Sequence, residues 1–119
     1  MSQLWIEPVN DIIVARVRGV PSEALLKECQ ERILSLVEET GNRSVLYDGL
    51  EMDPPPIDVP ISQWKLDSEI GTINLKRAVL VPNTRLAYLA RIAFGESDCR
   101  VFYNDMTGAV RWLSESGKG

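Results

Sequence analysis

The chain has 119 residues, of which 45% are hydrophobic and 25% charged, and its formal net charge is −4. This length suits a single domain, and the composition is that of an ordinary globular protein. The acidic balance argues against nucleic acid as a partner, because phosphate binding needs clustered Lys and Arg. The sequence contains no histidine, which removes the commonest general base and every Ser-His-Asp or Cys-His arrangement.

The sequence also contains few targeting or redox signals. No apolar run approaches the roughly 20 residues of a membrane-spanning helix, and the N-terminal stretch lacks the basic and apolar segments of a signal peptide. We therefore expect a cytoplasmic protein without a membrane span. Cys29 and Cys99 have no CxxC spacing, so we interpret them as small buried thiols rather than as a disulfide or a metal site.

The first 40 residues predict two strands and a helix. Residues 4–7 and 12–18 flank the polar turn Asn10-Asp11 and predict a hairpin, in which Arg16 and Arg18 keep one face of the second strand wet. Pro21-Ser22-Glu23 is typical of a helix start. Apolar residues at three- and four-residue spacing then predict a helix over residues 22–39.

A third strand is predicted over residues 43–48 (RSVLYD), followed by an irregular loop over residues 49–60 (GLEMDPPPIDVP). Three consecutive prolines forbid a helix in that loop and favour an extended path. The loop leaves the end of a central strand, where α/β proteins usually place their sites. A second helix is predicted from Pro60 to about Ile70.

The stretch 76–95 (KRAVLVPNTRLAYLARIAFG) predicts a buried strand and then a helix, which Asn83 caps and Gly95 ends. Residues 98–103 predict a fifth strand. Asn104 or Asp105 caps a last helix, which Gly108 weakens by up to about 1 kcal/mol relative to alanine. Residues 114–119 are expected to form a frayed C-terminal tail. The predicted order is β-β-α-β-α-β-α-β-α in a single domain over residues 1–119.

This order, together with three motifs, resembles the SpoIIAA-like or STAS (STAS/SEC14-like) domain family. The motifs are a helix beginning PSEALL after the hairpin, a third strand ending in Asp48, and a closing half with R-x-A-x-L-A-R, RVF and A-x-x-WL sequences. The resemblance covers nearly the whole chain. It implies an α/β fold with a mixed, mostly parallel five-stranded sheet, four helices and the first strand antiparallel at an edge.

The resemblance also implies a non-enzymatic regulatory module that binds another protein. Anti-sigma-factor antagonists of this fold bind a kinase-type partner, and phosphorylation of a serine controls that binding. Ser62 lies near the equivalent position as a candidate phosphorylation site, but it lacks the glycine that follows the antagonists' serine, so a plain helix N-cap is the simpler interpretation. The SEC14 analogy implies an alternative function, the binding of an apolar small molecule or lipid.

The candidate partner or ligand surface comprises Asp48, Asp58, Ser62 and Trp64. Trp64 could form an apolar patch with neighbouring side chains or could lie over the sheet as core; the neighbours are Met52, Ile57, Val59, Ile61 and Leu66. The four loop carboxylates could hold a divalent cation, although a solvated loop is the simpler interpretation; they are Asp48, Glu51, Asp53 and Asp58. No cofactor motif is visible, and sheet edges leave homodimer formation open.

Overall fold

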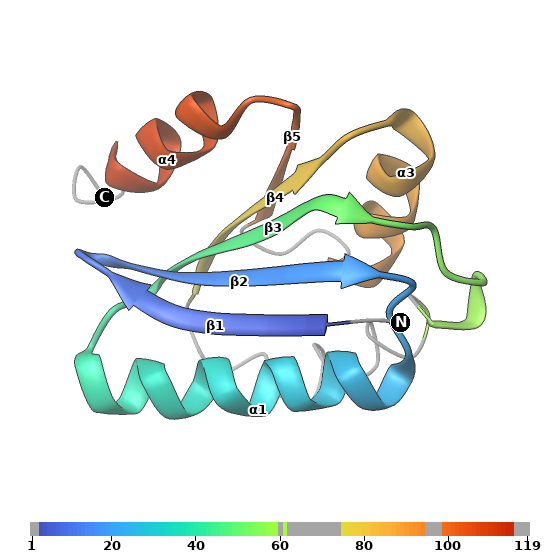
Figure 1. Ribbon diagram of the computed structural model, residues 1–119. Coiled ribbons are helices and arrows are strands. Elements are labelled where there is room, and N and C mark those ends of the chain that lie inside the picture. Colours follow the sequence, from blue (N-terminus) through green and yellow to red (C-terminus); the bar gives the residue numbers. More distant parts are fainter. Residues whose placement is uncertain (1–2, 60, 62–74, 95–98, 116–119) are drawn as a thin grey trace.

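The computed structural model describes residues 3–59, 61, 75–94 and 99–115 of the chain, and these residues form three layers (Figure 1). The middle layer is one sheet whose strands lie side by side in sequence order. The strands are β1 (Gln3–Val9), β2 (Ile12–Gly19), β3 (Ser44–Met52), β4 (Lys76–Val81) and β5 (Cys99–Tyr103). Helices α1 (Glu23–Thr40) and α3 (Thr84–Phe94) cover one face of the sheet, and α4 (Met106–Ser114) packs on the other.

The strand pairings confirm the predicted mixed sheet of five strands. β1 runs antiparallel to β2 at one edge, as the hairpin prediction requires. β2, β3, β4 and β5 then pair in parallel, each with the next. The described residues contain three helices rather than the four predicted, because the predicted second helix over residues 60–70 lies, apart from Ile61, outside them.

Strand β4 is buried on both faces, as its unbroken apolar sequence predicted. Ala78 and Leu80 pack against α4 with Leu113, whereas Val79 and Val81 pack against α3 on the opposite face. All four side chains are at most 3% exposed. A strand covered on both faces has no solvated side, and this explains the absence of polar alternation in its sequence.

The helix ends follow their capping residues. The Ser22 hydroxyl accepts a hydrogen bond from the Leu25 amide at 3.1 Å, and Gly41 ends α1 in the left-handed conformation at a φ of 79°. The Asn83 side chain caps α3 by accepting from the Leu86 amide at 2.9 Å. Asp105 is the residue that caps α4. These caps confirm the predicted starts of all three helices to within a residue or two.

Strand β3 is longer than its sequence predicted. It continues through Gly49 to Met52, so the segment predicted as loop over 49–60 begins as strand. The reason is its pairing with β2, which shifts register after Arg16 and resumes with Arg18 opposite Glu51 and Gly19 opposite Met52. Backbone pairing with a neighbour therefore overrides the glycine that suggested a strand end.

The tail predicted over residues 114–119 overlaps α4 at its first residue. Ser114 belongs to α4, and its hydroxyl donates to the Val110 carbonyl oxygen at 2.9 Å, whereas residues 116–119 lie outside the described residues. Among the helices that the structure describes, none combines the length and apolar character needed to cross a membrane.

Candidate functional site

The four predicted surface residues divide into two groups. Ser62 and Trp64 lie outside the described residues, so their predicted roles stay predictions. Asp48 lies in β3, and Asp58 lies on the segment that follows that strand. Asp58 is exposed at the start of a helical turn, in which the Ile61 amide donates to the Ile57 carbonyl oxygen at 3.3 Å. Helical geometry thus begins before Pro60, the residue at which the sequence predicted the helix to start.

Asp48 is a buried carboxylate held by two donors. Its residue is 5% exposed, and its Oδ2 accepts a hydrogen bond from Arg16 Nε at 3.1 Å. Its Oδ1 accepts from the Leu50 amide at 3.2 Å. Arg16 and Asp48 are register partners on β2 and β3, so both side chains project from the same face of the sheet. The Asp48 carboxylate is therefore engaged within the fold, and its predicted part in a partner surface stays a prediction.

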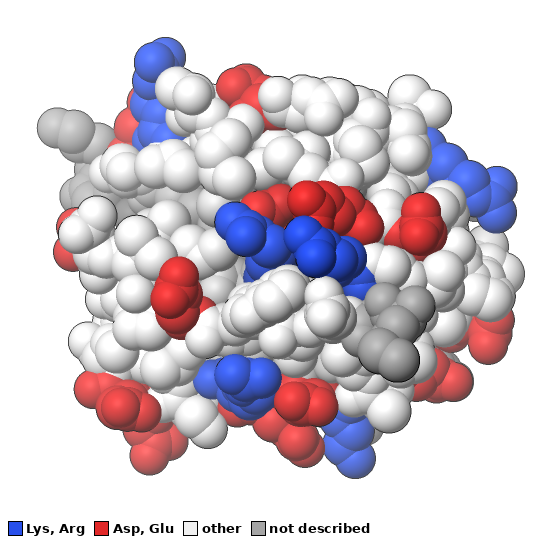
Figure 2. All heavy atoms as spheres, in the orientation of Figure 1, with Lys and Arg blue, Asp and Glu red and all other residues white. Residues whose placement is uncertain are grey.

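A second, exposed ion pair follows the first along the same strands. Arg18 pairs with Glu51, and its guanidinium lies 5.6 Å from the centre of the Trp5 ring. The hydrogen bond from Arg18, followed by its positive charge, lowers the pKa of the Glu51 carboxyl. Figure 2 shows basic and acidic side chains in contact near the middle of this face of the molecule.

These two pairs bear on the alternative of a divalent-cation site. Two of the four carboxylates proposed as ligands, Asp48 and Glu51, are bound to arginines. In the described part of the chain there is no group of three or more acidic or cysteine side chains that could hold a metal ion. Asp48 and Glu51 therefore each form an ion pair with an arginine of β2, and these two contacts link β2 to β3 next to the register shift.

The two pairs should differ in their effect on stability. We expect Arg16→Ala to lower the free energy of unfolding by about 1 kcal/mol, because it leaves the buried Asp48 carboxylate without its cation; the half-exposed arginine keeps the loss this small. Arg18→Ala should leave stability unchanged within error, because both members of that pair are about half exposed. Urea denaturation of both variants measures the difference. Equal losses in the two variants would contradict the assignment.

Three exposed apolar side chains lie on the segments that follow β2 and β3. Val20 follows β2 and is 49% exposed, and Ile57 and Ile61 follow β3 and are 51% and 42% exposed. The Asp53 amide donates to the Gly19 carbonyl oxygen at 2.8 Å, which holds the two exit segments together at one end of the sheet (Figure 1). We call Val20, Ile57 and Ile61 the carboxyl-end surface.

This surface differs from the patch predicted around Trp64. Val59 is 7% exposed and Met52 packs against the core beside α3, so both point inward, and Leu66 lies outside the described residues. Sequence reasoning missed Val20. The available signal was topological: the ends of neighbouring parallel strands meet at one edge, and Val20 directly follows one of those strands.

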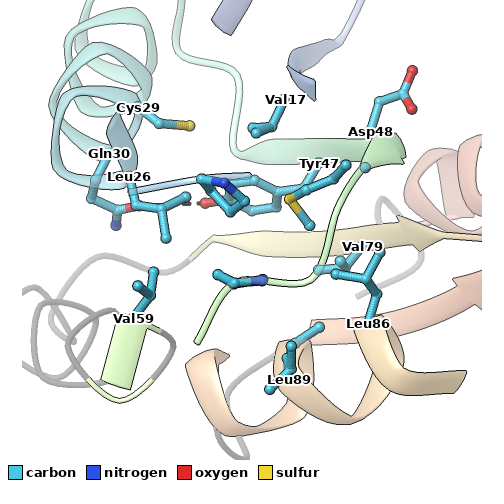
Figure 3. A pocket seen from close by; sticks show the side chains of 15 residues that line it. Val17, Leu26, Cys29, Gln30, Tyr47, Asp48, Val59, Val79, Leu86 and Leu89 are labelled. Carbon is cyan, nitrogen blue, oxygen red and sulfur yellow. Dashed lines mark hydrogen bonds between the residues drawn. The ribbon is translucent and has the colours of Figure 1, made fainter. Parts of the chain in front are cut away.

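A cavity of about 80 Å³ lies beneath the same end of the sheet, between α1 and α3. Its walls are almost wholly apolar, and they come from the sheet, from both helices and from the segment after β3 (Figure 3). Leu26 and Cys29 contribute from α1, Val79 from β4, and Leu86 and Leu89 from α3. Burial raises the pKa of the Cys29 thiol to about 12, so this thiol is neutral at physiological pH.

Besides the Cys29 thiol, three polar side chains line this cavity, those of Gln30, Tyr47 and Asp48. Gln30 on α1 is 5% exposed, and its Oε1 accepts a hydrogen bond from the Tyr47 hydroxyl at 3.4 Å. The Gln30 Nε2 atom is buried and has no hydrogen-bond partner. Asp48 also borders the cavity, but Figure 3 shows its carboxylate directed away from it, which agrees with the bond to Arg16. The sequence alone offered no signal for Gln30, which occupies an ordinary position on the buried stripe of α1.

Comparison with known proteins identifies the fold but no closer relationship. No protein-family model matches the chain, and no curated protein matches its sequence. The crystal structure of an uncharacterized DUF3478-family protein with a SpoIIAA-like fold from Shewanella loihica PV-4 matches with a TM-score of 0.63 and 19% identity. That match covers 94% of this chain and 93% of the other.

A second solved structure is similar over the same share of the chain. The anti-sigma factor antagonist SpoIIAA in its unphosphorylated form matches with a TM-score of 0.67 and 11% identity, over 94% of this chain and 98% of the other. At these identities the likeness shows the fold alone. The sequence motifs and the structural matches agree: this protein has the SpoIIAA-like fold.

Proposed function

We propose that this protein is a non-enzymatic interaction module that binds another protein through the carboxyl-end surface. The observation that carries the proposal is the exposure of three large aliphatic side chains, Val20, Ile57 and Ile61, on adjoining segments at one end of the sheet. Exposed apolar groups on adjoining segments are typical of interaction sites on soluble proteins. The structural likeness to an anti-sigma factor antagonist supports the proposal that the partner is a regulatory protein.

The chemistry near this surface supports a binding role rather than catalysis. The chain has no histidine, and the carboxylates of Asp48 and Glu51 are engaged by arginines. A general acid or base needs a carboxyl oxygen within reach of a substrate proton, and in both residues one oxygen is instead hydrogen-bonded to an arginine. Phosphorylation of Ser62, an anchoring role for Trp64, a homodimer and a cytoplasmic location stay predictions.

The alternative function, binding or sensing of an apolar small molecule or lipid, has weaker support. Ligand sites for drug-sized molecules typically enclose about 300–1,000 Å³. The cavity between α1 and α3 has about 80 Å³. A lipid chain would therefore need the walls of this cavity to move apart.

Two valines, one beside each end of β2, test the proposed surface. Val20 belongs to the surface and is 49% exposed, whereas Val9 lies at the β1–β2 hairpin and is 40% exposed. We expect Val20→Asp to reduce recovery of a specific partner from a lysate of the native host by at least about tenfold, because it buries a charge in an apolar interface. Val9→Asp should bind as the unchanged protein does.

Quantitative mass spectrometry of material captured on the tagged protein measures this recovery, and urea midpoints of both variants check that they fold equally well. A partner that binds the Val20 variant normally, or that is lost equally from the Val9 variant, would show that recognition occurs elsewhere on the molecule.

A further inference from the structure

Strand β1 is an edge of the sheet with one unpaired side. It pairs with β2, and no other described strand lies beside it (Figure 1). In an antiparallel pair, the backbone groups of successive residues point alternately toward the partner strand and away from it. Pro8 has no N–H group, and a proline in a sheet edge lies where its nitrogen faces away from the ladder. Pro8 therefore belongs to the outward-facing set, together with Ile6 and Leu4.

The β1–β2 turn leads to the same assignment. Val9 and Ile12 flank a two-residue turn, and residues in that position bond to each other. The alternation then makes Trp5 bond to β2 and leaves Leu4 and Ile6 facing outward. The N–H and C=O groups of Leu4 and Ile6 are therefore available to a further strand.

Residues 3–7 of β1 (QLWIE) lack the usual protection of a sheet edge. Exposed edges commonly carry lysine, proline or a bulge, each of which prevents pairing with another chain. This stretch contains none of them, and its register with β2 is continuous. Its centre instead holds Trp5, whose side chain is 50% exposed. Leu4 and Ile6 are only partly buried against the core beside α1, so a neighbouring strand would cover them further.

The outward edge of β1 is complementary to itself. A second copy of β1 can lie antiparallel to the first, with Leu4 of each copy opposite Ile6 of the other. Each such pair exchanges two backbone hydrogen bonds, so every outward N–H group of both residues gains an acceptor. Pro8 lies beyond these pairs, where no donor is needed. Trp5 then lies opposite Trp5 of the second copy at the two-fold axis, in the position where cross-strand side chains approach most closely.

The polar side chains of this edge fit the same register. Glu7 is exposed and forms no salt bridge with another described residue, and Gln3 Oε1 accepts from Arg18 Nη1 at 3.5 Å. Gln3 of one copy would lie opposite Glu7 of the other, so its amide can donate to that carboxylate while Arg18 adds a positive charge nearby. A register shifted by one pair would place Gln3 opposite Val9 and lose this match.

We propose that two copies of this protein associate through β1 and join their sheets into one continuous sheet, with Trp5 at the two-fold axis. The occupant of the open edge is thus a second copy of the chain. This interface is separate from the carboxyl-end surface, so it goes beyond the proposed binding of a protein partner and does not depend on it.

Amide hydrogen exchange of the purified protein, resolved by NMR, tests the pairing directly. We expect the Leu4 and Ile6 amides to exchange at least about tenfold more slowly at millimolar than at micromolar concentration, because only the dimer bonds them. The Trp5 amide, which bonds to β2, should exchange alike at both. Sedimentation equilibrium should show twice the mass of the chain at the higher concentration. A monomer at millimolar concentration, or a dimer in which the Leu4 and Ile6 amides gain no protection, would overturn the proposal.

Trp5→Lys provides a variant, because it places two like charges opposite each other at the two-fold axis. We expect it to weaken dimer formation at least about tenfold. Tyr88→Lys is the matched control, since Tyr88 is 58% exposed on α3, which packs against β4 and β5. A dimer that survives Trp5→Lys, or that is weakened equally by Tyr88→Lys, would overturn the proposal. Urea midpoints check that both variants fold, and the exchange result in the unchanged protein decides the question if one does not.

Discussion

Cys29 should react with iodoacetamide about 1,000 times more slowly in the folded protein at pH 8 than in the urea-unfolded chain. Burial, the largest cause, raises the pKa of its thiol from 9.0 to about 12. The thiolate is the species that reacts, and three pH units reduce its fraction about a thousandfold. A time course of the intact mass measures the rate, in a Cys99→Ser variant so that Cys29 is the single thiol.

The converse variant, Cys29→Ser, serves as the control, because Cys99 is partly exposed and should react readily in the folded state. A folded-state rate for Cys29 within tenfold of the unfolded rate would mean that this thiol is not enclosed as the structure shows. In that case the cavity wall formed by α1 would also need revision.

The raised pKa of Cys29 also makes stability depend on pH. Below pH 9 the thiol is neutral in both the folded and the unfolded chain, so it has no effect. As the pH rises from 9 toward 12, the unfolded chain ionises while the folded chain does not, and the folded state loses stability. Relative to Cys29→Ala, the protein should therefore lose about 1 kcal/mol of unfolding free energy by pH 10.

Ile13→Ala should lower the free energy of unfolding by about 3 kcal/mol, a large share of the roughly 5–15 kcal/mol that holds a domain of this size together. Ile13 is fully buried on β2, where it packs with Ile33 of α1 and Val45 of β3. Alanine would remove three carbon atoms from this contact and leave a cavity that the rigid sheet cannot close. Urea denaturation, read by circular dichroism, measures the loss.

Ile57→Ala is the matched control, because the same atoms are removed from a side chain that is 51% exposed. We expect it to change stability by less than about 0.5 kcal/mol. If Ile13→Ala cost less than about 1 kcal/mol, the packing of α1 against β2 would be looser than the structure indicates. Similar losses in both variants would show that Ile57 is buried in solution.

Most elements of the fold were predictable because their signals are local. The uninterrupted apolar run of β4, the helical spacing in α1 and the capping side chain of Asn83 each depend on residues a few positions apart. The mixed sheet with its antiparallel edge strand followed from the family resemblance of the whole chain, and the strand pairings confirm it. Local propensity and periodicity act within such short windows.

Gly108 shows where local reasoning gives an incomplete result. The low helix propensity of glycine marks Gly108 as a weak point of α4, so local reasoning predicts that alanine at this position would stabilise the helix. In the structure, a Cβ atom at this position would lie 2.2 Å from Oδ2 of Asp105, the residue that caps the helix. The Asp105 Oδ1 atom accepts from the Gly108 amide at 2.9 Å, so alanine would gain propensity while displacing the cap.

The candidate site was predicted less well than the fold. Asp48 was chosen because it ends a strand, yet its carboxylate pairs with Arg16 across 32 residues of sequence, and that pairing determines its role. Val20 and Ile57 come from separate segments that a backbone hydrogen bond between Asp53 and Gly19 holds together. None of these relations has a signature within a short window of sequence.

The sequence by itself determined where most of the described strands and helices begin, that the domain is α/β, and which family of folds it resembles, because spacing and capping are properties of neighbouring residues. Only the tertiary structure decided that Asp48 is paired and enclosed, that Val20, Ile57 and Ile61 are exposed on segments that leave the same end of the sheet, and that the Gln30 side chain is buried beside a cavity. Burial and hydrogen-bond satisfaction depend on chain segments that are distant in sequence and meet only when the sheet and its helices assemble.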